Sequence, residues 1–193
     1  MHINKQMNDF VIGLLKTRIP ANYYYHNYHH TLYVMDKVLE IGKQENCTAR
    51  ELELLSAAAL WHDTGYINTY QGHEEAGCEL AREYLPGYPF SPDDINTICG
   101  MIMATKIPQS PKNKLEEILA DADLEYLGTE HAAVMANHLF KELNALDPLF
   151  TEVAWNRIEI DFLTTHRYFT GYCKANKEHL KNSYLQILIS NKA

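Results

Sequence analysis

The sequence has few cysteines, and none of them are arranged in close pairs. Its four cysteines are spread over 193 residues, without the two-residue separation that is typical of zinc ribbons and redox motifs. A disulfide framework and a structural zinc site are therefore not expected, and we predict reduced thiols in a cytoplasmic protein. The cysteines are Cys47, Cys78, Cys99 and Cys173.

Long apolar runs are also missing. No stretch of about 18 consecutive apolar residues occurs, so a transmembrane helix is not expected. Residues 1–20 contain only a short apolar patch interrupted by charges, unlike the apolar region of a signal peptide. We therefore predict a protein that is neither secreted nor bound to a membrane.

Basic residues are scarce. The chain has 17 Lys and Arg against 25 Asp and Glu, and its formal net charge is -8. Nucleic acid polymers are not expected as partners, because such binding draws much of its affinity from clustered Lys and Arg. A small anionic ligand is compatible with this charge, because a bound metal cation can outweigh the negative charge around it.

Strand-like alternation is nearly absent, and helical periodicity dominates. We predict an all-α bundle of about eight or nine helices. We expect these helices to form a single domain, 1–193, because a chain of this length can bury one hydrophobic core large enough to stabilise it. A first helix should end before Pro20, and Asn27 is a candidate N-cap for a helix that runs to about Lys43.

The next helix carries a clear start signal. Thr48 and Glu51 form a capping box, and the helix should end at Gly65 with His62 facing inward near its end. Later helices are separated by Pro and Gly residues. They are expected at about 73–85, 91–104, 113–127, 130–146, 149–169 and 172–190.

A set of possible metal ligands recurs in order along these helices. It comprises His30, the adjacent His62 and Asp63, and a carboxylate at 121 or 123. Mixed imidazole and carboxylate sets suit Mn, Fe, Co, Ni or Zn, and bundle cores often hold them. A single histidine on an apolar helical face is more often a hydrogen-bonded core residue, so the prediction depends on the ordered set.

This order resembles the HD superfamily of metal-dependent phosphohydrolases, which is defined by His, HisAsp and Asp motifs on a helical bundle. The resemblance covers residues 25–128, with helices 130–190 expected to pack on that core, and it rests on YHNYHHTLYV, LWHDTGY, HEEAGCELA and LADADLEYLG. It implies one divalent cation, which would be Mn, Fe, Co, Ni, Zn or Mg. The implied ligands are His30, His62, Asp63 and Asp123.

The choice between the two aspartates in ADAD is less direct. Asp121 and Asp123 both follow an alanine and lie on different faces of a helix. The family's metal aspartate is usually followed by a short apolar stretch and often a glycine, which favours Asp123. Asp121 would then be an acid behind the ligands or facing the substrate.

The resemblance also implies catalytic helpers. His26 occupies the position of a histidine that protonates the leaving oxygen in the cyclic-nucleotide phosphodiesterase branch, although it could instead cap or pack a helix start. Glu74 would orient or deprotonate the attacking water, or else be a solvated first-turn carboxylate. Lys106 could hold a phosphate. Arg167 could also reach a phosphate, but an Arg near a helix end is more often solvated or a cap for backbone carbonyls.

Two departures from the family pattern narrow the prediction. His73 is the only histidine between Asp63 and Asp123, which favours one metal over the two of other branches. Tyr66 stands where the family often has a lysine. We expect hydrolysis of a phosphomonoester or phosphodiester of a small substrate, with a nucleotide favoured. The alternatives are a di-iron oxygenase and a catalytically silent module that binds a nucleotide.

Overall fold

The structure, a computed structural model, describes residues 5–191, and this part of the chain is helical with no strand. It contains ten α-helices, nine of them longer than six residues, and three short 3-10 helices. The predicted all-α fold is confirmed. The tenth helix arises because the expected last helix is divided into two.

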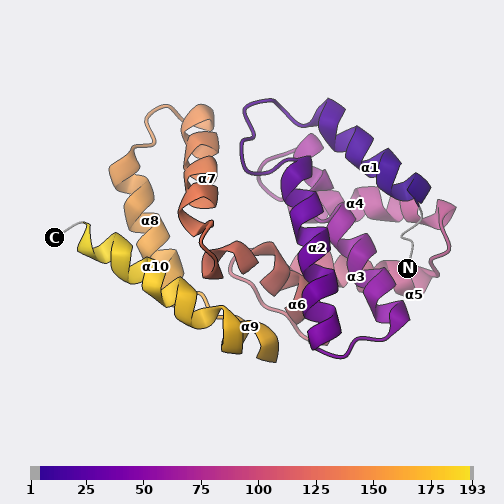
Figure 1. Ribbon diagram of the computed structural model, residues 1–193. Helices are drawn as coiled ribbons and strands as arrows, with labels where there is room; N and C mark the ends of the chain where they lie inside the picture. The colour runs from indigo at the N-terminus through magenta and orange to yellow at the C-terminus, as the bar shows by residue number, and fades with distance from the viewer. Residues whose placement is uncertain (1–4, 192–193) are drawn as a thin grey trace.

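The first six helices form one half of the molecule (Figure 1). Within this half α2 packs on α3 and α6, and α5 packs on α3, α4 and α6. Their bounds are α1 Lys5–Arg18, α2 Tyr28–Gln44, α3 Ala49–Trp61, α4 His73–Tyr84, α5 Pro92–Ala104 and α6 Lys114–Asp123, with the 3-10 helices η1 Thr64–Ile67 and η2 Leu85–Gly87 between them.

The remaining helices lie beside this half, along the face where α6 ends (Figure 1). The helix α10 packs on η3 and α8, and α7 also contacts η3. Their bounds are η3 Glu125–Gly128, α7 Ala132–Leu146, α8 Glu152–Thr165, α9 Gly171–Asn176 and α10 Glu178–Ser190.

The predicted start signals are confirmed. The Asn27 side chain accepts a hydrogen bond from the backbone N–H of His29 at the start of α2. Thr48 and Glu51 form a reciprocal capping box at the start of α3. These caps satisfy backbone donors that a helix start leaves without partners, and they fix the positions at which α2 and α3 begin.

Four predicted helix ends differ from the structure. The helix expected to end at Gly65 stops at Trp61, and Gly65 belongs to the separate η1. The helix expected over 113–127 stops at Asp123 and continues as η3. The one expected over 149–169 stops at Thr165 because His166 is extended, with φ -60° and ψ 138°. The one expected over 172–190 is interrupted at Lys177, whose backbone packs where a Cβ on Gly128 would lie 2.9 Å or less away.

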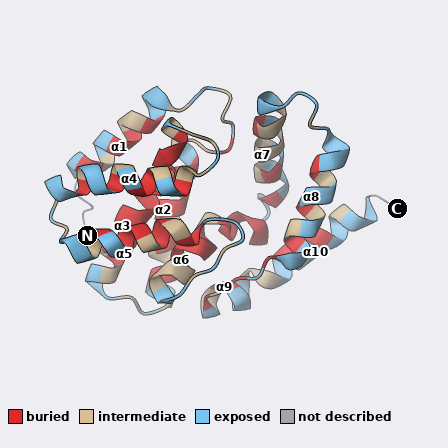
Figure 2. Ribbon diagram, turned by 180° about the vertical axis from the view of Figure 1, so that it is seen from behind, coloured by how far each residue is buried: buried red, intermediate tan, exposed pale blue. Residues whose placement is uncertain are grey.

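Two apolar clusters hold these elements together. The larger fills the space among α1 to α6, where buried residues concentrate in α2, α3 and α6 (Figure 2). The smaller joins η3 to α8 and α10 through Leu124, Tyr126, Leu163 and Leu185. Tyr168, after α8, belongs to the larger cluster and donates hydrogen bonds to backbone carbonyls beside Asp123, so the two halves meet where α6 ends.

No helix among the described residues is long and apolar enough to cross a membrane. All four cysteines are free thiols, as predicted, and three of them are buried.

Candidate metal centre

The ends of three helices bring the four predicted ligands to one point. His30 comes from the first turn of α2, His62 and Asp63 follow directly after α3, and Asp123 is the last residue of α6. His30 Nε2 lies 2.9 Å from Asp123 Oδ1 and 3.5 Å from Asp63 Oδ2. His62 Nε2 lies 3.2 Å from Asp63 Oδ2 and 3.6 Å from Asp123 Oδ1.

This geometry fits a divalent cation. Ligand atoms of His30, His62 and Asp123 lie within 4.8 Å of one another, and mixed imidazole and carboxylate donors are the set that such cations accept. The Nδ1–H of His62 donates to the Ala59 carbonyl at 2.7 Å, so the Nε2 lone pair points toward the carboxylates. His62 Nε2 and Asp63 Oδ2 are buried without a hydrogen-bond partner.

The charges of the ligand histidines and carboxylates strongly shift one another's pKa values. Burial acts to lower the pKa of His62, but Asp63 and Asp123 outweigh it and raise that pKa well above its usual value. Burial likewise acts to raise the pKa of each carboxyl group, but the neighbouring histidines hold both values well below the usual range. Both carboxylates are therefore ionised, and a positive charge balances them, either on protonated His62 or on a bound cation that takes the place of that proton.

A glycine allows the turn after Asp63 to approach α4. A Cβ on Gly65 would lie 1.8 Å from the backbone oxygen of His73 and 2.7 Å from the backbone N of Gly77. Only glycine fits at such a distance, so the packing of η1 on α4 needs this residue. The same contact places His73 and Glu74 next to the ligands.

Two histidines and a tyrosine stack beside the cluster. Tyr66 lies between His26 and His73, with ring centroids 4.2 Å and 3.9 Å away. His26 Nε2 is 3.0 Å from the Tyr66 hydroxyl, and its Nδ1 contacts Glu142 at 2.5 Å. Tyr66, at the position where the family often has lysine, thus orders two imidazoles.

Glu142 was not predicted from the sequence. Its carboxylate, fully buried on α7, also accepts hydrogen bonds from the backbone N–H groups of Tyr25 and His26 and from the Tyr70 hydroxyl, at 2.8, 3.0 and 3.0 Å. Burial acts to raise its pKa, but the His26 side chain and the backbone N–H groups of His26 and Tyr25 lower it. The available signal was an acid on the inward stripe of a helix that also carries Ala136 and Leu139.

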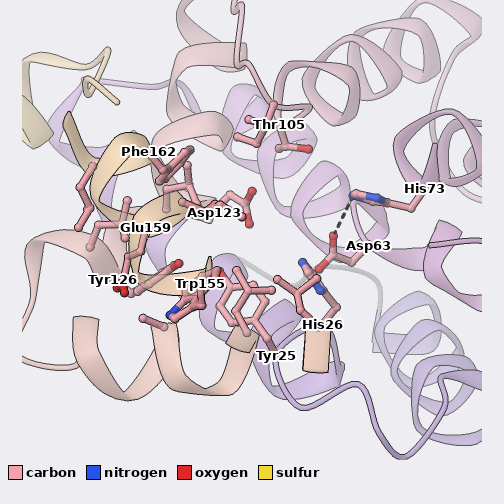
Figure 3. A pocket seen from close by; sticks show the side chains of 18 of the residues that line it. Tyr25, His26, Asp63, His73, Thr105, Asp123, Tyr126, Trp155, Glu159 and Phe162 are labelled. Atoms are coloured by element: carbon pink, nitrogen blue, oxygen red, sulfur yellow. Dashed lines mark ion pairs between the residues drawn. The ribbon is translucent and has the colours of Figure 1, made fainter. Parts of the chain in front are cut away.

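Glu74 and His73 lie on the cavity side of α4. Both line the cavity described below, and Glu74 is buried although it belongs to the first turn of a helix. His73 Nε2 lies 3.6 Å from Glu74 Oε1 and 3.9 Å from Asp63 Oδ1, the contact drawn in Figure 3. Glu74 is therefore not the solvated carboxylate that was the alternative interpretation.

Asp121 does not reach the ligands, which corrects its proposed place among the catalytic residues. Its carboxylate accepts hydrogen bonds from the backbone N–H groups of Phe169 and Thr170, at 2.9 and 2.8 Å, and from the Thr170 hydroxyl at 2.6 Å. The structure therefore brings Asp123 to the cluster, and Asp121, on another side of α6, ties that helix to the segment before α9.

Lys106 also lies outside the site, and its proposed role as a phosphate clamp needs correction. Its ammonium group is half-exposed and pairs with Glu75, and it does not line the cavity that contains the ligands. Arg167 donates to the carbonyls of Thr164 and His166, both at 2.7 Å, and so caps the end of α8, which was one of its alternative roles.

A cavity of about 320 Å³ opens beside the cluster. Figure 3 shows Asp63 and His73 at one side of it and Trp155, Phe162 and Glu159 at the other. The ligand cluster therefore faces a space large enough for a small organic molecule. The remaining lining residues are Tyr25, His26, Tyr66, Glu74, Thr105, Ile107, Asp123, Leu124, Tyr126, Leu127, Ala136, Leu139, Leu143, Ile158 and Leu163.

Comparison with known proteins agrees with the motif order and the geometry. The HD domain family matches residues 27–126, a little over half of the chain. The chain belongs to the HD domain family. The match includes all four predicted ligands, whereas Glu142 and the α7 and α8 side of the cavity lie beyond it.

A solved structure supports the same fold. It is described as a predicted HD superfamily hydrolase from an uncultured Thermotogales bacterium, and it is 20% identical with a TM-score of 0.60 over 100% of both chains. A search of curated proteins found no match to this chain. The likeness therefore extends the HD fold to the whole chain, including α7 to α10.

Proposed function

We propose that this chain is a metal-dependent phosphohydrolase that cleaves a phosphomonoester or phosphodiester bond of a small substrate. The observation that carries the proposal is the convergence of His30, His62, Asp63 and Asp123 on one point, from which Asp63 and Asp123 face a cavity. The description of the similar solved structure as a predicted HD superfamily hydrolase supports it.

A single divalent cation would be held by these four residues. When bound, it would supply Lewis acidity, which lowers the pKa of water and polarises phosphoryl oxygens. Asp63 would hold the attacking water in line as well as bind the cation, because its second oxygen faces His73 in the cavity. The proton would pass from that water to Glu74, which is buried close by.

The leaving oxygen would receive its proton from His26. This side chain lines the cavity and is held at Nδ1 by the Glu142 carboxylate, so its Nε2 is directed toward the Tyr66 hydroxyl and the cavity. An ionised partner at Nδ1 stabilises the imidazolium before transfer and the neutral tautomer with Nδ1–H afterwards. Capping of α2 falls to Asn27 instead.

A panel of phosphate esters tests this function. The purified protein is assayed with phosphomonoesters, phosphodiesters and nucleotides in the presence of Mn, Co, Ni, Mg or Zn, and its metal content is measured before exposure to chelators. We expect turnover with about one metal per chain and none in His62→Ala. A folded protein with no turnover under any condition contradicts the proposal, and two irons per chain would favour the oxygenase alternative.

A further inference from the structure

The side of the cavity opposite the ligands is an apolar chamber built by α7 and α8. We use this name for the part of the cavity lined by Leu139, Leu143, Trp155, Ile158 and Phe162. Trp155 is itself almost fully buried, and Figure 3 shows it together with Phe162 across the cavity from Asp63. The part of a bound substrate that extends from the ligand cluster across the cavity would therefore contact an apolar surface.

Apart from its histidines, the ionisable side chains that line the cavity and carry a charge are all acidic. Asp63, Glu74, Asp123 and Glu159 line it, and among the residues that the structure describes no Lys or Arg does. The Glu159 carboxylate accepts a hydrogen bond from the Tyr184 hydroxyl at 2.6 Å, on the side of the cavity away from Asp63 (Figure 3). A second negative group on a substrate would meet carboxylates, with no Lys or Arg in the described lining of the cavity.

The two observations select a substrate class. We propose that the substrate carries a single phosphoryl group at the ligand cluster and an uncharged, mainly apolar organic group in the apolar chamber. This inference rests on the proposed function and narrows its substrate. Burial of the organic group against Trp155 and Phe162 supplies binding energy, and the missing Lys and Arg disfavour di- and triphosphates because those need cations at each phosphate.

The first test compares esters that differ only in the organic group or in the number of phosphates. The panel contains naphthyl, phenyl and hexyl phosphate, glycerol phosphate, and the adenosine mono-, di- and triphosphates. We expect kcat/KM for hexyl phosphate to exceed that for glycerol phosphate, whose leaving group is an alkoxide of similar basicity, by at least about tenfold, as a well-filled apolar pocket allows. We expect the di- and triphosphates to be the poorest substrates.

The outcomes separate the two proposals. If glycerol phosphate, the adenosine monophosphate or a polyphosphate is hydrolysed as well as or better than hexyl phosphate, the substrate class is wrong and the phosphohydrolase activity stands. If no ester is hydrolysed, the proposed function fails, and the binding test below decides whether the chamber accepts an apolar phosphate compound.

The second test measures binding without turnover. Naphthylmethyl phosphonate, which cannot be hydrolysed at its carbon–phosphorus bond, is titrated into the metal-loaded protein while tryptophan fluorescence is recorded. The only tryptophans are Trp61, in the core, and Trp155, in the chamber. We expect a saturable change in emission that is absent in Trp155→Phe, and binding weakened at least about tenfold in Leu143→Lys.

A matched variant controls for placing a charge on α7. Val134→Lys lies on the same helix, but its side chain is exposed and does not line the cavity, so it should bind the phosphonate as the wild type does. Equal affinity in Leu143→Lys and the wild type, or a fluorescence change that persists in Trp155→Phe, overturns the proposed use of the chamber.

Discussion

At the scale of single residues, orientation on a helix decides which acid reaches the ligand cluster. Asp121 and Asp123 are two positions apart, which turns their side chains by about 200° relative to each other. Asp123 Oδ1 lies 2.9 Å from His30 Nε2, whereas Asp121 binds the segment that contains Phe169 and Thr170. Asp123 is thus placed to bind a metal, whereas Asp121 holds α6 against a neighbouring segment.

This difference predicts opposite effects of two matched substitutions. Asp123→Asn removes a charged ligand, so we expect the protein to lose its metal and its activity together. Asp121→Asn should keep about one metal per chain but lower the free energy of unfolding by about 1–3 kcal/mol, because buried donors lose a charged acceptor. Elemental analysis and urea unfolding measure the two effects. Metal loss in Asp121→Asn with retention in Asp123→Asn would reverse the assignment.

A second residue-scale prediction concerns the anchor of His26. Glu142→Gln should keep the metal but disturb the contact at His26 Nδ1, and so weaken proton donation to the leaving oxygen. We expect kcat for an alkyl phosphate to fall by about 10- to 100-fold, which is less than the roughly 10²- to 10⁴-fold contribution of general acid catalysis because His26 itself remains. The leaving group of 4-nitrophenyl phosphate needs no proton, so its kcat should change little.

The ratio of the two rates is the decisive measurement, since a general disturbance of the fold would slow both esters alike. Parallel losses for the two esters in Glu142→Gln would contradict the positioning role.

At the scale of elements, the approach of η1 to α4 depends on a glycine. Alanine at position 65 would place Cβ against the backbone of His73, so either η1 or α4 must move. We expect Gly65→Ala to lower the free energy of unfolding by about 1–3 kcal/mol, the usual cost of overpacking, and to weaken metal binding because Asp63 precedes this turn. Thermal unfolding with and without added Mn measures both.

A glycine in open surroundings provides the control. Nothing lies within 4 Å of a Cβ built on Gly13 in α1, so Gly13→Ala should leave metal binding unchanged and stabilise the protein by up to about 1 kcal/mol through helix propensity. A stable, metal-binding Gly65→Ala variant would show that the turn tolerates a different path.

The elements of the first half were predictable because their signals are local. Asn27, Thr48 and Glu51 define helix starts through short-range hydrogen bonds, and the order of the HD motifs led to the four ligands. The end of α8 at Thr165 and the break at Lys177 depend on contacts between segments that are distant in the sequence, and local helix propensity does not reveal such contacts. Glu142 was missed for the same reason, since its partners lie more than 70 residues away.

At the scale of the whole molecule, the C-terminal helices do more than extend the bundle. They supply one side of the cavity, through α7 and α8, and the carboxylate that holds His26. The segment between α8 and α9 in turn binds Asp121 of α6. Proper geometry at the ligand cluster therefore depends on how α7 to α10 are held against the first half.

One buried group in that C-terminal region makes the stability of the molecule depend on pH. His166 follows α8, and the ammonium group of Lys181 on α10 donates to its backbone carbonyl at 2.6 Å and lies 3.3 Å from its Nδ1. Burial, and then Lys181, lower the pKa of His166 from 6.5 to about 4, with Arg167 acting in the same direction and Glu178 opposing them.

The neutral imidazole is therefore the form that the folded protein accepts, and a histidine in the unfolded chain takes up a proton near pH 6.5. Stability from this group is fully present above pH 6.5 and is lost as the pH falls toward 4. Because each unit of pKa difference corresponds to about 1.4 kcal/mol, the loss is at most about 3.5 kcal/mol. His166→Asn, which keeps the backbone carbonyl and offers a side-chain acceptor to Lys181, should flatten the unfolding free energy between pH 6.5 and 4, as measured by urea unfolding. His131→Asn, at an exposed histidine, should follow the wild-type curve, and parallel curves for His166→Asn and the wild type would show that His166 is not the group responsible.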